Sequence, residues 1–188
     1  MMISAVLDAC VLYSASLRDF FLWLAHFNQF RPHWSEEIHR EWMRSLHANR
    51  SEMLWERLEY TRRQMDSEFP NSLVRGYESL MPTLQLPDPS DTHVLAVAIQ
   101  AKAQYIVTFN LNDFPKSVLQ TYGVVALSPE AFALRLIDHA PYPVLRAVRK
   151  HRLSLKQPPK TVDEYLVTLE RQRLPKIVAF LRKHKDSI

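Results

Sequence analysis

The fold of this chain is decided by two neighbouring stretches, LPDPSDTHVLAVAI at residues 86–99 and YIVTFNLNDF at residues 105–114. The first is a carboxylate-bearing loop that runs into an apolar helix, and the second is a short apolar strand that ends in a polar turn. A third apolar run, residues 3–7, ends directly before Asp8. Short apolar strands that alternate with helices predict a parallel sheet in an α/β sandwich.

Hydrophobic periodicity and capping signals predict the other elements. We expect strands at residues 3–7, 105–108 and 124–127, helices at 17–27, 36–48, 51–69, 90–103, 114–122 and 129–139, and a loop with a short helix at 70–87. Ser35 is the expected N-cap of the helix at 36–48. Leu54, Leu58 and Met65 are the expected buried face of the helix at 51–69, and Pro32 is expected to stop the chain.

The C-terminal part differs from the rest of the chain in charge. Residues 141–188 contain 12 Lys+Arg and 4 Asp+Glu, whereas residues 1–140 contain 12 and 16. After a break at Pro141 and Pro143 we expect a basic helix at 144–155, and then a last helix that Thr161 caps and Pro175 divides. We therefore predict a domain at residues 1–140 and a basic helical C-terminal extension at 141–188, which favours a polyanion or an acidic protein as a partner.

Composition excludes several classes of protein. The chain of 188 residues has one cysteine, Cys10, which rules out an intrachain disulfide and a cysteine-rich zinc module. It has two glycines and no glycine-rich phosphate-binding motif. No apolar run approaches the roughly 20 residues of a membrane span, and the N-terminus lacks the pattern of a signal peptide. We therefore expect a cytoplasmic protein without a membrane partner.

The candidate site is a set of oxygen donors at one edge of the predicted sheet. Asp8 follows the first strand, Glu41 lies inside a helix, and Asp91 begins the central helix, while Asn110 and Asp113 lie in the turn after the next strand. Sites in parallel sheets lie at the carboxyl ends of the strands. Carboxylate and amide oxygens are the ligands that Mg²⁺ and Mn²⁺ prefer. These residues therefore predict a hard-metal site.

Four motifs resemble those of the PIN-domain ribonucleases. They are LDACVL at residues 7–12, EEIHREW at 36–42, DPSDTHVLA at 88–96 and TFNLNDF at 108–114. They occur in the family's order, and the resemblance spans roughly residues 3–127. The chain is most similar to the VapC-type toxins of bacterial toxin–antitoxin modules, some of which carry a helical C-terminal extension.

The resemblance implies a three-layer α/β/α sandwich and a Mg²⁺- or Mn²⁺-dependent endoribonuclease that hydrolyses RNA phosphodiester bonds. It also implies homodimers and a small cognate antitoxin. By the resemblance, Asp8 and Asp91 hold the metal, Glu41 binds metal or positions the attacking water, and Thr108 supports the site by hydrogen bonding. Asn110 is the remaining expected site residue.

Asn110 departs from the family pattern, in which an acidic residue is common at this position. An amide oxygen still binds a hard cation but carries no charge, so it weakens metal affinity, chiefly for a second metal. The sequence leaves open whether one or two metals bind. It also leaves two alternatives, a catalytically degenerate module that binds RNA or protein, and a housekeeping RNA-processing nuclease.

Overall fold

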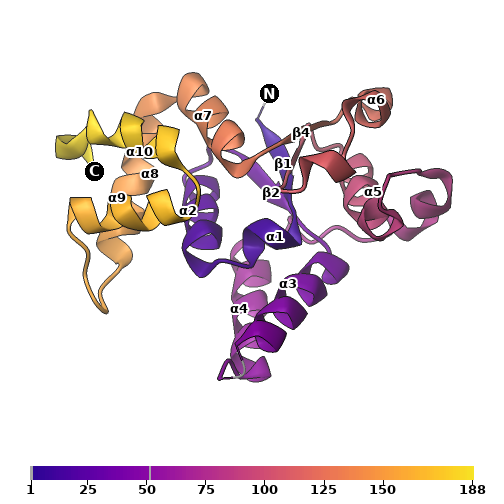
Figure 1. The fold of residues 1–188 in the computed structure, drawn as a ribbon, viewed down its shortest axis with the longest axis horizontal. Coiled ribbons are helices and arrows are strands. Elements are labelled where there is room, and N and C mark those ends of the chain that lie inside the picture. The colour runs from indigo at the N-terminus through magenta and orange to yellow at the C-terminus, as the bar shows by residue number, and fades with distance from the viewer. Residues whose placement is uncertain (1, 51) are drawn as a thin grey trace.

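The computed structural model describes residues 2–50 and 52–188 and has a four-stranded parallel sheet at its centre (Figure 1). The strands are β1 (Ser4–Leu7), β2 (Arg31–His33), β3 (Tyr105–Val107) and β4 (Val125–Leu127), in the order β2-β1-β3-β4. The register pairs Leu7 with Val107, and Val107 with Leu127. The carboxyl ends of three strands therefore meet at one edge of the sheet.

Strand β2 was not predicted, because Pro32 was expected only to stop the chain. Pro32 lies inside β2 and pairs with Ala5 of β1. β2 forms an outer edge of the sheet, where one side of the strand needs no ladder hydrogen bonds and the missing N–H of proline is tolerated.

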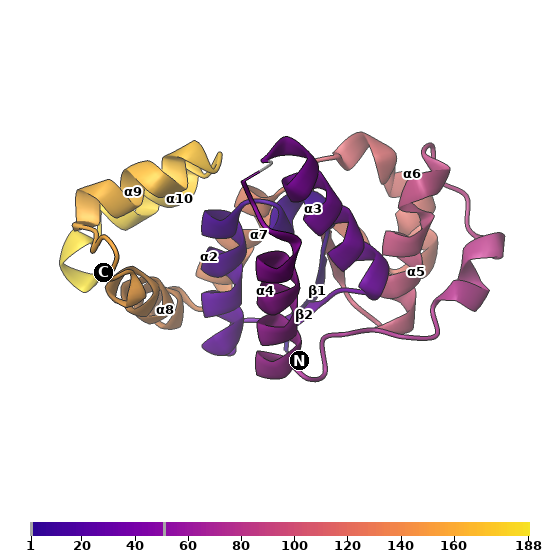
Figure 2. The same cartoon turned by 90° about the horizontal axis from the view of Figure 1, so that it is seen from below.

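Helices cover both faces of the sheet and complete the predicted α/β/α sandwich. α2 (Ala15–His26) and α7 (Pro129–His139) lie on one face, while α5 (Thr92–Gln100) and α6 (Lys116–Leu119) lie on the other (Figure 2). Under α2 and α7 the core is aromatic, since the ring of Phe132 lies 6.0 Å from that of Phe21 and 5.1 Å from that of Phe30. α5 is buried from Thr92 to Ala98 without interruption, which explains why its sequence is apolar almost all round.

α3 (Glu36–Asn49) and α4 (Trp55–Glu68) form a helical pair beside the carboxyl edge of the sheet (Figure 1). The Ser35 hydroxyl accepts a hydrogen bond from the Ile38 N–H, which confirms the predicted N-cap. In α4, Leu58 and Met65 are buried as predicted, but Leu54 is 60% exposed. The prediction for Leu54 was wrong because α4 begins at Trp55, so Leu54 precedes the helix; Ser51, the expected start, lies outside the described residues.

The C-terminal helices α8 (Pro141–Ser154), α9 (Val162–Arg171) and α10 (Pro175–Arg182) form a further layer outside α2 and α7 (Figure 1). The predicted break lies between α7 and α8, but α8 begins at Pro141 and not at residue 144 as expected, because proline is tolerated in the first turn of a helix. Thr161 and Glu164 form a reciprocal capping box at the start of α9, as the Thr161 cap predicted.

The shorter elements are α1 (Ala9–Leu12) and the 3₁₀ turns η1 (Glu78–Thr83), η2 (Pro89–Asp91), η3 (Leu111–Asp113), η4 (Gln120–Tyr122) and η5 (Lys185–Ser187). Across residues 2–50 and 52–188, none of the helices has the length and apolar character that a membrane crossing requires. The division of the chain at residue 140 stays a prediction.

Candidate metal site at the carboxyl edge of the sheet

Asp8 and Thr108 are brought together by the register of β1 and β3. Each follows its strand directly, and the Asp8 N–H donates to the Val107 carbonyl at 3.1 Å, which continues the ladder by one residue. The Thr108 hydroxyl donates to Asp8 Oδ2 at 2.6 Å, although the two residues are 100 positions apart in the sequence. Both residues are buried. The Asp8 carboxylate is therefore held in a fixed orientation.

Two further groups fix Asp8. Its Oδ1 accepts a hydrogen bond from the Ala9 N–H at 2.6 Å and so caps α1, and the Cys10 thiol donates to Oδ2 at 3.1 Å. Burial raises the pKa of Asp8, the hydrogen bonds from Thr108, Cys10 and Ala9 lower it, and the charge of Glu41 raises it, with a net upward shift. Burial and the neighbouring Asp8 raise the pKa of Cys10 to about 12, so the thiol stays protonated and acts as a donor at neutral pH.

Glu41 reaches the same edge from α3 and is held by a histidine that sequence reasoning missed. Its Oε1 lies 2.9 Å from Nε2 of His93, which is on α5. The His93 side chain is 5% exposed, and its Nδ1 has no hydrogen-bond partner among the described residues. Burial lowers the pKa of His93, but the hydrogen bond to Glu41 and the charges of Glu41 and Asp8 outweigh it and raise that pKa. A histidine in the otherwise largely apolar run of α5 was the signal in the sequence that could have identified His93.

Asp91 occupies the N-cap position of α5 but makes no capping hydrogen bond with its side chain. Partial burial, followed by the charges of Asp8, Asp113, Asp88 and Glu41, raises the pKa of Asp91 to about 6. The carboxylates of Asp8, Glu41 and Asp91 are thus close enough for their charges to act on one another. Asp8 follows β1, Glu41 lies in α3, and Asp91 is the N-cap of α5.

The turn after β3 contributes to the candidate site less directly than Asp8, Glu41 and Asp91 do. The Asn110 N–H donates to the Thr108 hydroxyl oxygen at 3.0 Å, and the Asn110 side chain is exposed at the rim of the site. Asp113, at the end of η3, adds its charge to the surroundings of Asp91. Asp88 has a turn-forming role instead, because its Oδ1 accepts hydrogen bonds from both the backbone N–H and the hydroxyl of Ser90.

Glu36 and Glu37, which share the second motif with Glu41, have cationic partners. Glu37 pairs with Arg40 at 2.8 Å and Glu36 with Arg62 at 3.3 Å. Among the described residues, Asp8, Glu41 and Asp91 form no ion pair with a lysine or an arginine. Clustered carboxylates without a lysine or arginine beside them are a donor set that a divalent cation stabilises.

The donor chemistry fits Mg²⁺ or Mn²⁺, although the side chains do not form a complete ligand cage. Within the described ranges, no group of three or more His, Cys, Asp and Glu side chains is arranged to hold a metal ion. Mg²⁺ usually binds through one or two carboxylates and keeps several of its waters. Two carboxylates, such as those of Asp8 and Asp91, are the kind of donor set that such a cation takes.

Two protein-family models match successive parts of the chain. The model of the PIN domain family matches residues 4–112, and that of the VapC50 C-terminal domain matches residues 129–183. The first match covers more than half of the chain, so the protein belongs to the PIN domain family. The five candidate site residues lie within that match.

A curated relative adds a more specific likeness. Over 88 residues, or 45% of this chain and 52% of the relative, the sequence is 35% identical to the Mycobacterium tuberculosis protein named "Putative ribonuclease VapC50". The chain thus matches about half the length of that relative. No solved structure matches the chain.

Proposed function

We propose that this protein is a divalent-metal-dependent endoribonuclease of the PIN family. One observation carries the proposal: Asp8, Glu41 and Asp91 act on one another as like charges at the carboxyl edge of the sheet, where partial burial, and then the charges of these and the other neighbouring carboxylates, raise the pKa of Asp91 to about 6. Mutual repulsion of this kind is unfavourable in the free protein and is relieved when a cation binds between the carboxylates. The likeness to a relative that is named as a ribonuclease gives independent support.

Each residue has a distinct part in the proposed hydrolysis. Asp8 and Asp91 hold Mg²⁺ or Mn²⁺, which when bound lowers the pKa of a water and stabilises negative charge on the phosphate. Glu41, oriented by His93, accepts the proton of the attacking water. The water oxygen attacks phosphorus, the bond to the leaving ribose oxygen breaks, and that oxygen takes up a proton. Thr108 keeps the Asp8 carboxylate in place.

Asn110 limits how many cations the site needs. Its amide oxygen carries no charge, and its side chain is exposed. We therefore propose one tightly bound cation, held by Asp8 and Asp91, as the minimum for activity.

The VapC likeness further suggests a toxin of a bacterial toxin–antitoxin module. We propose an RNA substrate, a small cognate antitoxin that blocks the site, and a homodimer. Expression of the protein should then arrest bacterial growth, while expression of Asp91→Ala should not. Growth arrest that persists in Asp91→Ala would contradict the toxin proposal.

Cleavage of total RNA by the purified protein tests the proposed activity. With Mg²⁺ or Mn²⁺ we expect discrete fragments that disappear when EDTA is added and in the Asp91→Ala variant. RNA that is bound but never cut would instead support the catalytically degenerate alternative. Mapping the fragment ends would show whether the substrate is one that a housekeeping nuclease processes.

A further inference from the structure

The turn between α9 and α10 reaches from the C-terminal extension back to the candidate site. The Ser14 hydroxyl donates to Gln172 Oε1 at 2.5 Å, and the Arg173 guanidinium carbon lies 5.4 Å from the ring centre of Phe109. Ser14 follows β1 and α1, and Phe109 follows β3. The turn therefore contacts the segments that leave the carboxyl ends of both strands.

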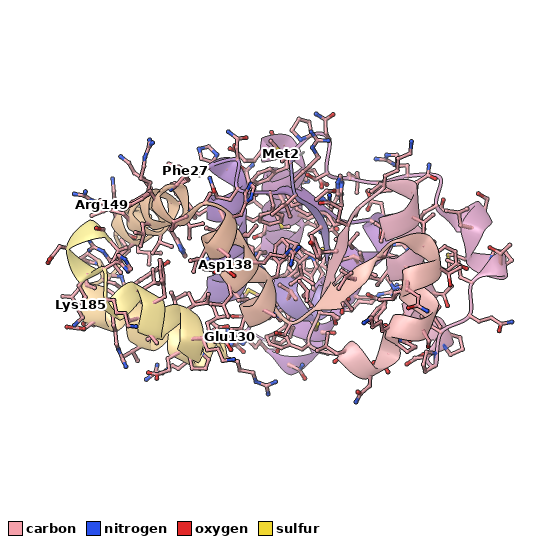
Figure 3. The ribbon with its side chains drawn as sticks, turned by 90° about the horizontal axis from the view of Figure 1, so that it is seen from above. Met2, Phe27, Glu130, Asp138, Arg149 and Lys185 are labelled. Atoms are coloured by element: carbon pink, nitrogen blue, oxygen red, sulfur yellow. The ribbon has the colours of Figure 1, made fainter. Side chains whose placement is uncertain are left out.

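A third contact lies on α7, which follows β4. The backbone N–H of Lys176 donates to Glu130 Oε1 at 2.5 Å, and Glu130 is placed next to the C-terminal helices in Figure 3. In the same view, Arg149 and Lys185 lie on the outer side of the extension, away from the sheet. These contacts thus bring the α9–α10 end of the extension to the carboxyl edge of the sheet.

Arg173 lies over the ring of Phe109, a residue of the turn that follows β3 and borders the candidate site. Phe109 lies between Thr108 and Asn110, and its N–H donates to Cys10 Sγ at 3.3 Å, the same sulfur that donates to Asp8. The face of the Phe109 ring therefore carries the Arg173 guanidinium beside the turn that borders the carboxylates.

The Arg173 side chain is exposed and available to a ligand. Elsewhere in the extension, Arg182 pairs with Glu170 and Lys185 pairs with Asp163. Within the described part of the chain, Arg173 has no carboxylate partner. An arginine presents a planar set of N–H donors that matches a phosphate group, and stacking on an aromatic ring pre-orients it.

The negative charge of the candidate site means that RNA binding requires a positively charged residue such as Arg173 nearby. The carboxylates that attract a metal repel an RNA backbone, so much of the RNA affinity must come from positive side chains nearby. Residues 141–188 supply 12 of the 24 Lys+Arg in the chain, and the α9–α10 turn carries part of that charge to the carboxyl edge.

We propose that Arg173 binds an RNA phosphate adjacent to the scissile one, so that the C-terminal extension forms one side of the substrate-binding surface. This inference rests on the proposed ribonuclease function.

A cavity of about 800 Å³ continues the surface past Gln172. Among the residues that line it are Tyr13, Arg50, Glu56, Arg57, Tyr60 and Gln172, so it offers two exposed guanidinium groups, those of Arg50 and Arg57, and two aromatic rings to the next nucleotides.

The competing explanation is that Arg173 only fastens the extension to the PIN domain. A guanidinium that lies over the half-buried ring of Phe109 contributes to such packing by a cation–π contact. The backbone of Arg173 offers a way to separate the two roles, because its φ is 63°, in the left-handed region that glycine adopts with least strain. Arg173→Gly therefore removes the charge while relieving backbone strain, and the fold should tolerate it.

Lys102→Gly is the matched control. Lys102 has φ 52°, is exposed and follows α5, near the amino end of β3 and thus at the opposite edge of the sheet. Lys102→Gly therefore removes one positive charge and relieves backbone strain, as Arg173→Gly does. Arg149→Ala is a second control, since it removes a charge from the outer side of the extension.

The experiment measures binding of a fluorescein-labelled single-stranded RNA of mixed sequence by anisotropy, in the cleavage-deficient Asp8→Asn background with Mg²⁺. We expect Arg173→Gly to weaken binding about tenfold and to reduce the slope of log K against log[salt] by about 0.7, with an unchanged or higher Tm. Both controls should stay within about twofold of the parent. Arg173→Met, which keeps a long apolar side chain over Phe109, should weaken binding to a similar extent.

The outcomes distinguish the inference from the proposed function. If the protein cleaves and binds RNA but Arg173→Gly and Arg173→Met bind as well as the controls, the inference about Arg173 is wrong and the ribonuclease proposal stands. If Arg173→Gly lowers Tm but does not weaken RNA binding, Arg173 only stabilises the packing of the C-terminal extension on the PIN domain. If the wild-type protein neither cleaves nor binds RNA, the ribonuclease function itself fails.

Discussion

Glu41 and His93 are hydrogen-bonded at 2.9 Å across the carboxyl edge of the sheet, although they lie 52 residues apart and on different helices. The bond links α3 to α5, so it fixes the position of the Glu41 carboxylate relative to Asp91, the N-cap of α5. Partners of this kind orient the acidic groups of a metal site, and their loss typically reduces activity or metal affinity 10- to 100-fold.

His93→Leu should therefore reduce kcat for RNA cleavage by about 10- to 100-fold with a smaller effect on KM. The side chain of leucine fills the buried space but donates no hydrogen bond to Glu41. His93→Gln keeps an N–H donor at a similar reach and should recover part of the lost kcat. Steady-state cleavage of one defined RNA measures both effects. Equal kcat values for His93→Leu and the wild type would rule out a positioning role for His93.

Thr108→Val tests the support of Asp8. Valine has nearly the shape of threonine, but it loses the 2.6 Å hydrogen bond to Asp8 Oδ2 and the acceptor for the Asn110 N–H. We expect a loss of about 1–3 kcal/mol in the free energy of unfolding, measured by chemical denaturation, because a buried carboxylate loses a donor. Thr108→Ser, which keeps the hydroxyl, should lose less.

The same variant should change the pH dependence of cleavage. The Thr108 hydrogen bond lowers the pKa of Asp8, so its removal raises that pKa further. Protons then compete with the metal at higher pH, and the acid limb of the cleavage profile at subsaturating Mn²⁺ should move upward in pH. A downward shift of that limb would contradict the proposed role of Thr108.

Asp91→Asn should stabilise the metal-free protein. The folded-state pKa of Asp91 is raised from 3.8 to about 6, so the ionised carboxylate destabilises the fold fully above about pH 6 and loses this effect as pH falls toward 4. Because the carboxyl group is partly exposed, we expect a gain of only about 1 kcal/mol at pH 7.5. Thermal unfolding in EDTA should show this gain at pH 7.5 and less of it at pH 5.

Asp88→Asn provides the control for that measurement. Asp88 is exposed and hydrogen-bonded to Ser90, so its replacement should bring no gain in Tm at pH 7.5. A gain from Asp88→Asn that equals the gain from Asp91→Asn would show that general charge reduction, and not the site, is responsible.

The parts of the structure that could be predicted from sequence depend on local or strand-end relationships. Ser35 and Thr161 cap helices through bonds that span three residues. Asp8 and Thr108 meet because parallel strands bring their carboxyl ends together, and that rule needs only the positions of the strands. The sandwich itself follows from the alternation of apolar strands and helices.

The parts that could not be predicted depend on how distant elements pack. His93 is recognised as part of the site only when α3 is placed beside α5, and Arg173 only when the α9–α10 turn is placed on Phe109. β2 was missed because it has three residues, one of them Pro32, and its strand character comes from pairing with β1. Tertiary contact overrides local propensity in such segments.

Binding of Mn²⁺ to the metal-free protein, measured by isothermal titration calorimetry at pH 7.5, tests the central claim most directly. The account predicts a binding event in the wild type that Asp8→Asn and Asp91→Asn each abolish or weaken by at least about tenfold, since each removes a carboxylate ligand. Asp88→Asn should bind like the wild type. No binding in the wild type, or equal binding in all four proteins, would contradict a metal site formed by Asp8 and Asp91.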